Sequence, residues 1–238
     1  MQTIKLHQIS KNFKSKQALK NINIEFQNNK INGLLGPNGS GKTTLFNIIT
    51  GFLSPNDGLI SLDGKDLTSL NLSMRSKLGI SYLPQEASIF REMNVYDNIH
   101  CIAELFHENI KSIEVTNNLI KQFSLQGFQK TKGKLLSGGE RRRTEIARAL
   151  ASNPKFLLLD EPFAGIDPIA IEEVKKTIAL LKNLEIGIII TDHNVKEALS
   201  IVDFGYIIYN GEIIKSGSPK EIISDKLVKK IYLGDNYQ

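Results

Sequence analysis

The feature that most constrains this chain is a glycine-rich loop between a short apolar run and a segment of helix-forming residues. The loop reads Gly36-Pro37-Asn38-Gly39-Ser40-Gly41-Lys42-Thr43, which is a complete GxxxxGK[ST] pattern. The apolar run Ile31–Leu35 precedes it, and the composition of Thr43–Ile49 predicts a helix after it. In a strand, loop and helix of this kind, backbone N–H groups surround phosphate oxygens at a helix N-terminus, which carries partial positive charge. The pattern therefore predicts a nucleotide-phosphate site rather than a plain glycine-rich turn.

Three side chains at the end of this loop are assigned to the predicted site. Lys42 is expected to contact the β- and γ-phosphates, and the hydroxyl of Thr43 to bind Mg²⁺. Thr44 comes next and is counted with the nucleotide-binding residues. The guanine-specific pattern Asn-Lys-x-Asp is absent from the sequence, which favours ATP over GTP.

A second apolar run ends in two carboxylates. Phe156–Leu159 predicts a buried strand of a parallel sheet, with Asp160 and Glu161 at its carboxyl end, where ligands bind in such sheets. Asp160 is expected to hold Mg²⁺, directly or through water, and Glu161 to orient and deprotonate the attacking water. The same pair is also compatible with a plain polar strand end, but the phosphate loop in the same chain favours the catalytic interpretation.

A third motif begins a predicted amphipathic helix. It consists of Ser137, Gly138, Gly139 and Glu140, and three arginines follow it. Ser137 and Glu140 fit a capping box, so a well-capped helix is one interpretation. The two glycines also expose backbone N–H groups at a helix N-terminus, which predicts a second phosphate-binding surface.

The remaining apolar pattern predicts alternating strands and helices around a parallel sheet. Strands are expected at Leu78–Leu83 and Ile186–Ile190, and a helix is expected to begin at Asp167-Pro168. The opening residues alternate as an antiparallel flap would. From Val95 to about Leu150 the pattern is helical, with one apolar face made of Ile99, Ile102, Ala103 and Phe106 and another made of Ile113, Leu119, Ile120 and Phe123.

Composition limits the broad class of protein. With 238 residues, 41% apolar and 23% charged, the chain is expected to form one large domain or one domain with an inserted lobe. Cys101 is the single cysteine, and no Cys/His cluster has zinc spacing, so a reducing compartment is expected. The net charge of +5 is modest and favours an ordinary solvated surface, with no nucleic-acid partner. No secretory or membrane-spanning pattern is found, which predicts a cytosolic location.

Along the chain, the phosphate loop, the Ser137–Glu140 motif and the strand that ends in Asp160 and Glu161 follow one another in an order and spacing that resemble those of the ATP-binding cassette (ABC) ATPases. The resemblance covers essentially the whole chain. It implies that Gln85 is the Q-loop residue that binds Mg²⁺ and reports nucleotide occupancy, and that His193 is the switch histidine that contacts the γ-phosphate. It also implies that Asp167 belongs to the D-loop and that Phe13 stacks on adenine, where the family often has tyrosine.

The resemblance implies the fold as well. The expected class is α/β, a P-loop NTPase with a RecA-like parallel-sheet core, an antiparallel β subdomain and an inserted α-helical subdomain. Residues 1–86 and 152–238 would form the nucleotide-binding core and residues 87–151 the helical subdomain. In the family, two cassettes pack head to tail with ATP between them, so Ser137, Gly138 and Gly139 would complete the partner's site. A homodimer, or a heterodimer with another cassette, is implied.

Agreement outside the ATP motifs narrows the resemblance. The segments Tyr82–Arg91 and Val95–Ile99 are similar to those of the ATPase subunits of lipopolysaccharide export transporters. This implies two membrane permease subunits as partners and a peripheral position on the cytoplasmic face of the inner membrane. Phe90 and Arg91 are candidates for gripping the permeases' coupling helices, because an exposed aromatic beside an arginine is a typical anchor pair. Phe90 is equally compatible with a core position.

Other classes remain open on the sequence alone. The ATPase of a branched-chain amino-acid importer also has a phenylalanine after its Q-loop glutamine. A soluble cassette ATPase of iron–sulfur cluster assembly would share the chemistry without transport. A translation-factor type is disfavoured, because such proteins usually carry two cassettes joined by a basic linker and this chain has one.

Overall fold

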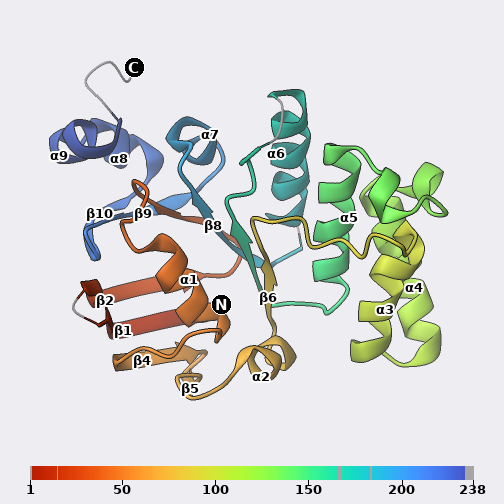
Figure 1. Cartoon of the computed structure of the whole chain (residues 1–238), viewed down its shortest axis with the longest axis horizontal. Coiled ribbons are helices and arrows are strands. Elements are labelled where there is room, and N and C mark those ends of the chain that lie inside the picture. The colour runs from red at the N-terminus through yellow and green to blue at the C-terminus, as the bar shows by residue number, and fades with distance from the viewer. Residues whose placement is uncertain (1, 15, 166–167, 183, 234–238) are drawn as a thin grey trace.

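The computed structural model describes residues 2–14, 16–165, 168–182 and 184–233 as two β-sheets with helices around them (Figure 1). The strands are β1 (Thr3–Phe13), β2 (Lys16–Gln27), β3 (Ile31–Leu35), β4 (Asp57–Leu62), β5 (Lys65–Asp66), β6 (Ile80–Leu83), β7 (Phe156–Asp160), β8 (Gly187–Asp192), β9 (Phe204–Tyr209) and β10 (Glu212–Gly217). The α-helices are α1 (Lys42–Thr50), α2 (Leu72–Lys77), α3 (Val95–Phe106), α4 (Asn109–Gln122), α5 (Gly138–Leu150), α6 (Pro168–Lys182), α7 (Val195–Leu199), α8 (Pro219–Ser224) and α9 (Lys226–Val228). Short 3₁₀ turns occupy Gln126–Phe128 and Gly133–Leu135, and a π-helical turn occupies Lys229–Leu233.

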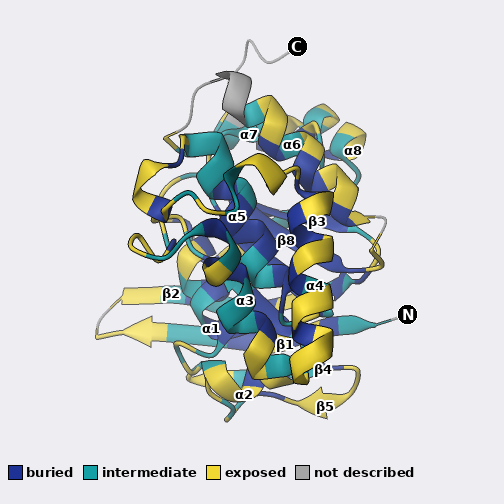
Figure 2. Ribbon diagram, turned by 90° about the vertical axis from the view of Figure 1, so that its right-hand side faces the viewer, coloured by how far each residue is buried: buried dark blue, intermediate teal, exposed yellow. Residues whose placement is uncertain are grey.

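The larger sheet has the strand order β10-β9-β3-β8-β7-β6, and only β10 runs antiparallel to its neighbour. Every residue of β3, β7 and β8 is buried, as the continuous apolar runs predict for strands covered on both faces. Figure 2 shows these central strands in dark blue beneath helices with exposed outer faces. In register, Leu35 pairs with Asp192, and Asp160 pairs with Thr191. The carboxyl ends of three strands therefore meet at one edge of the sheet.

The smaller sheet is the predicted antiparallel flap, in the order β2-β1-β4-β5. Its apolar face and the larger sheet enclose α1 between them. Leu45, Phe46 and Ile49 of α1 pack in one buried cluster with Phe26 of β2 and Phe156 of β7. The helix that follows the phosphate loop is therefore held from both sides.

Helices α3, α4 and α5 lie together on the opposite side of the larger sheet from the flap (Figure 1). Their apolar residues join the core of the sheet: Ile99 and Ile146 share one buried cluster with Leu159 of β7. Of the second apolar face that the sequence predicts, Leu119, Ile120 and Phe123 are buried, but including Ile113 in it is wrong, because that residue is 47% exposed. The inward face of α4 carries Ser112 instead, whose hydroxyl is satisfied by a backbone carbonyl within the helix, so the buried face is less apolar than the sequence pattern suggests.

A buried arginine ties α2 to the end of α1. Arg75 is 1% exposed, and every hydrogen-bond acceptor of its guanidinium among the described residues is a backbone carbonyl. The acceptors are Ile48 (2.5 Å), Ile49 (2.9 Å), Leu70 (2.8 Å) and Thr68 (3.3 Å). Burial lowers the pKa of Arg75 to about 10. The arginine therefore caps the carboxyl end of α1, where the helix carbonyls have no partners of their own.

We expect Arg75→Met to lower the free energy of unfolding by about 2–4 kcal/mol, because it removes a charged donor and leaves buried carbonyls unsatisfied. Chemical denaturation followed by circular dichroism measures this. The matched control is Lys77→Met on the same short helix, where the lysine is exposed and the change should stay within about 0.5 kcal/mol. Equal effects of the two substitutions would contradict the capping role.

Candidate functional site

The predicted phosphate loop joins β3 to α1, as the sequence pattern indicates. Lys42 is 5% exposed, and its ammonium donates hydrogen bonds to the carbonyl oxygens of Gly36 (2.8 Å) and Pro37 (3.1 Å). A side chain at position 36 would place its Cβ 2.1 Å from the carbonyl oxygen of Ile208, so the close approach of β9 requires glycine there. The loop is thus packed against the sheet and closes around the lysine.

The loop fits a phosphate ligand. The hydroxyl of Ser40 is buried and has no hydrogen-bond partner among the described residues. Gly39 has φ 76°, and a Cβ built there meets no atom within 4 Å, so the backbone at this point faces open space. Burial lowers the pKa of Lys42, while Glu161, Asp192 and Asp160 act in the opposite direction. Phosphate oxygens would satisfy the orphaned hydroxyl and the N–H groups that begin α1.

Asp160 ends β7 with its carboxylate held by two hydroxyl groups. Thr191 donates to one oxygen at 2.5 Å, and Tyr82 donates to the other at 3.2 Å. Burial, with the neighbouring carboxylate as a further cause, raises the pKa of Tyr82, so its phenol stays a donor. Sequence reasoning missed Thr191 and Tyr82, and their only signal was their place at or near the ends of predicted strands. The arrangement orients the Asp160 carboxylate at the edge where the phosphate loop begins.

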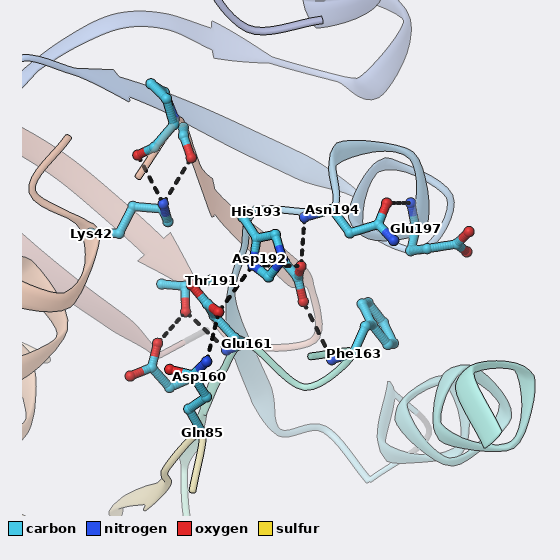
Figure 3. A network of polar contacts seen from close by, with 12 residues as sticks. Lys42, Gln85, Asp160, Glu161, Phe163, Thr191, Asp192, His193, Asn194 and Glu197 are labelled. Carbon is cyan, nitrogen blue, oxygen red and sulfur yellow. Dashed lines mark hydrogen bonds and ion pairs between the residues drawn. The ribbon is translucent and has the colours of Figure 1, made fainter. Parts of the chain in front are cut away.

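Two other predicted residues, Gln85 and His193, contact the carboxylate of Glu161 (Figure 3). Its carboxylate accepts a hydrogen bond from the amide of Gln85 at 3.0 Å and lies 3.0 Å from Nδ1 of His193. The backbone of Glu161 has φ 43°, in the left-handed region, and its N–H donates to the carbonyl of Thr191 at 2.9 Å. The strained turn directs the carboxylate toward the Q-loop and the switch histidine, which come from distant parts of the chain.

Asp192 supports the turn that carries His193. Its carboxylate is fully buried and accepts hydrogen bonds from the N–H groups of Asn194 (2.7 Å) and Phe163 (3.3 Å). Burial raises the pKa of Asp192, and these two bonds oppose that shift. The sequence analysis did not single out this residue, although it directly precedes His193. Asp192 therefore links the end of β8 to the segment that follows Glu161.

The motif at the start of α5 forms the predicted capping box. Ser137 is the N-cap: its hydroxyl accepts from the N–H of Glu140, whose carboxylate accepts from the N–H of Ser137. A Cβ at Gly139 would lie 2.7 Å from a carboxylate oxygen of Glu173. No hydrogen bond or ion pair within the described ranges joins Ser137 to Glu161. Gly138 lines a small pocket that Glu161 also lines.

The other predicted residues lie apart from this network. Phe13 ends β1 and is 46% exposed, with the ammonium of Lys11 5.6 Å from its ring centre. Asp167 lies outside the described residues. Phe90 is 45% exposed, which excludes the core position that the sequence left open. Arg91 beside it is exposed as well.

Phe90 lines a groove of about 850 Å³ between α2, β6, α3 and α5. The guanidinium of Arg148 lies over its ring at 4.7 Å. Its backbone is fixed by the buried side chain of Asn98, which accepts from the N–H at 2.9 Å and donates to the carbonyl at 3.0 Å. The ring is thus held in place although it faces solvent.

Comparison with known proteins agrees with this site. The ABC transporter family matches residues 19–164, which include the phosphate loop, the capped helix α5 and the Asp160-Glu161 pair. The chain belongs to this family and is an ATP-binding cassette ATPase. Its fold is that of solved cassettes: it superposes on MJ1267, an ATP-binding cassette of an ABC transporter, with a TM-score of 0.88 and 30% identity over 99% of this chain and 100% of that one.

Relatives match over the whole chain. The lipopolysaccharide export system ATP-binding protein LptB of Haemophilus influenzae is 43% identical over 240 residues, covering 100% of both chains. The protein of the same name from Escherichia coli K12 is 42% identical over 241 residues, again covering 100% of both. The structure of cbiO1 from Clostridium perfringens matches with a TM-score of 0.86 and 28% identity, covering 97% of this chain and 94% of that one.

The hydrogen bond from the Thr191 hydroxyl to the Asp160 carboxylate can be tested by substitution. We expect Thr191→Val to lower kcat for ATP hydrolysis about tenfold or more, because a hydrogen bond to a carboxylate contributes about 1.5–3 kcal/mol. Thr191→Ser retains the hydroxyl and serves as the control, with kcat close to wild type. Steady-state ATPase assays measure both. Equal kcat for Thr191→Val and wild type would show that Asp160 does not depend on this hydroxyl.

Proposed function

We propose that the chain is the ATPase subunit of a lipopolysaccharide export transporter. The observation that carries this proposal is the agreement with two lipopolysaccharide export ATP-binding proteins at 42–43% identity along the full length of both chains. A cassette contacts ATP and its permease rather than the cargo, so the proposed substrate rests on these relatives.

The groove at Phe90 supports a permease partner. It has apolar walls from Leu72, Leu105 and Phe106, and Arg148 contributes a positive charge. An amphipathic helix from a membrane subunit fits a groove of this kind, with its apolar face inside. Phe90 and Arg91 would grip that helix from the segment that directly follows the Q-loop.

We further propose that two copies pack head to tail with ATP between them. Ser137, Gly138 and Gly139 lie at the N-terminus of α5 and make no hydrogen bond or ion pair with Lys42 in the part of the chain described here. A second copy would bring this helix to the γ-phosphate. The proposed location is peripheral, on the cytoplasmic face of the inner membrane beside two permease subunits. None of the helices among the described residues combines the length and apolarity needed to cross a bilayer.

The proposed roles of the site residues combine their positions with the roles that cassette ATPases assign to these motifs. Lys42 and the N–H groups of the loop bind the β- and γ-phosphates and stabilise the charge of the transferred group. Glu161 orients the attacking water and accepts its proton. His193 contacts the γ-phosphate, and Gln85 senses whether it is present. The Phe13 ring stacks on adenine, and Asp167 contacts nucleotide across the dimer.

Mg²⁺ fits the same edge of the sheet. The hydroxyl of Thr43 is exposed, and the Asp160 carboxylate is oriented by two hydroxyl groups, so both are oxygen ligands of the kind this ion prefers. Gln85 is the third proposed ligand. The described residues contain no cluster of three or more His, Cys, Asp or Glu, which agrees with an ion held largely by phosphate and water oxygens. When bound, Mg²⁺ neutralises charge on the β- and γ-phosphates.

The catalytic role of Glu161 predicts a separation of binding from hydrolysis. We expect Glu161→Gln to lower kcat about 10²–10⁴-fold, because the amide cannot accept the proton. ATP affinity should be retained, and the variant should accumulate as a dimer in ATP. Turnover assays, nucleotide titration and light scattering measure these quantities. Hydrolysis at a near wild-type rate would rule out Glu161 as the base.

The export assignment is tested by purifying the tagged protein from detergent-solubilised membranes and identifying its partners by mass spectrometry. Two different permease subunits of a lipopolysaccharide exporter are expected in stoichiometric amounts. Recovery of amino-acid permeases instead would mean that the transported substrate is an amino acid. Recovery of an iron–sulfur scaffold from the soluble fraction would mean that the chain has no transport function. In either case the ATPase assignment would stand.

Phe90 predicts where the permeases bind. We expect Phe90→Ala to reduce the recovery of permease subunits at least about tenfold, because truncation of a central aromatic anchor costs about 2 kcal/mol or more. Ile110→Ala is the matched control: Ile110 is 86% exposed on α4 and does not line the groove. Both variants should keep the wild-type melting temperature. Loss of permeases from both, or from neither, would contradict a role for the groove.

A further inference from the structure

A small cavity lies between the catalytic carboxylate and the start of α5. Its volume is about 40 Å³. It is lined by Gln85, Ala87, Gly138, Arg141, Arg142, Glu145, Glu161, Pro162 and Ala164. A buried water needs roughly 10–15 Å³, so the cavity holds about three waters or one small oxyanion. A nucleoside is far too large for it. The cavity is therefore too small to be the ATP site, although Glu161 and Gln85 border both.

Arg142 is the unusual residue of this cavity. Its side chain is 9% exposed, and Nη1 donates to the carbonyl of Pro84 at 3.1 Å and to Glu145 at 3.4 Å. Nε and Nη2 are buried and have no hydrogen-bond acceptor among the described residues. Buried guanidinium donors without acceptors are costly, and they are arranged in a rigid fork that matches two oxygens of a phosphate. The unpaired donors thus point to an oxyanion as their missing partner.

The nearest carboxylate does not fully compensate this charge. One oxygen of Glu145 is engaged by the backbone N–H groups of Ser88 (2.7 Å) and Ile89 (3.0 Å), and the other makes only the long contact with Arg142. Burial lowers the pKa of Arg142, with Glu145 opposing the shift, but a guanidinium remains protonated. Arg141 adds a second positive charge to the wall. Glu145 and Glu161 also line the wall, so a small anion would be held there by the unpaired guanidinium donors of Arg142 rather than by an excess of positive charge.

We propose that this cavity is a transient binding site for inorganic phosphate on its way out of the active site. The γ-phosphate is released beside Glu161, and Glu161 is also part of the cavity wall. Nε and Nη2 of Arg142 donate to two oxygens of the departing phosphate, and no covalent bond forms or breaks in this step. Because Arg142 also bonds the carbonyl of Pro84, directly before Gln85, departure of the phosphate is linked to the Q-loop. The proposal rests on ATP hydrolysis by this chain and is independent of the transported substrate.

The test is product inhibition by inorganic phosphate in steady-state ATPase assays. We expect Arg142→Gln to raise the inhibition constant for phosphate at least about tenfold, since two charge-assisted hydrogen bonds are lost. The KM for ATP should change less than this. Arg142→Lys keeps the positive charge but not the forked pair of donors. Its inhibition constant for phosphate should lie between those of the wild type and Arg142→Gln. Single-turnover assays that compare cleavage with phosphate release should show a shorter delay in Arg142→Gln than in wild type.

Arg143→Gln is the matched control, because Arg143 is the next residue of α5 but pairs with Glu173 at 2.7 Å and does not line the cavity. Its inhibition constant should match wild type. If Arg142→Gln does not fold, Arg142→Lys carries the comparison. An unchanged constant in the Arg142 variants, or a wild type that millimolar phosphate does not inhibit, would overturn the proposal. If the wild type fails to hydrolyse ATP, the functional assignment fails instead, and titration of the ADP-loaded protein with phosphate still tests the cavity.

Discussion

The parallel pairing of β3, β7 and β8 is the constraint on which the site depends. Each strand is buried throughout and mostly apolar, and the carboxylates and hydroxyl of the site appear where β7 and β8 end. The register pairs Leu35 with Asp192 and Asp160 with Thr191, which places the phosphate loop, the two carboxylates and the switch histidine at one edge. A strand shifted by one residue would reverse its inward and outward side chains and remove this convergence.

One buried lysine and three carboxylates lie close together at that edge of the sheet. Lys42 is buried near three carboxylates, of which Asp160 is held by hydroxyl donors and Asp192 by backbone donors. Glu161 differs, because its partners are the side chains of Gln85 and His193. Fixed donors keep the first two carboxylates in place, whereas side-chain partners are able to rearrange. The network therefore combines a rigid base with a carboxylate that is free to change partners when nucleotide binds.

Helix α5 connects this edge to the groove. Arg142 bonds the carbonyl before Gln85, and Glu145 accepts from the backbone just after it, so one helix holds both ends of the Q-loop. One turn further on, Arg148 donates to the hydroxyl of Ser88 at 2.7 Å and lies over the ring of Phe90. A movement of α5 would therefore displace Gln85 and Phe90 together. This gives a continuous physical link between the phosphate site and the surface proposed to meet the permease.

The sequence by itself determined the fold class and the phosphate loop, because buried parallel strands and phosphate loops have strong local patterns. Gln85 and His193, which both contact Glu161, were assigned only through the resemblance to cassette ATPases. The sequence pattern misjudged Ile113, since a hydroxyl satisfied inside the helix makes a buried face look polar. Only the tertiary structure decided that Thr191 and Tyr82 hold Asp160, that Phe90 faces solvent and that two donors of Arg142 have no acceptor among the described residues. These properties depend on which distant segments surround a side chain, and burial and hydrogen-bond partners of that kind leave no periodic signal in the chain.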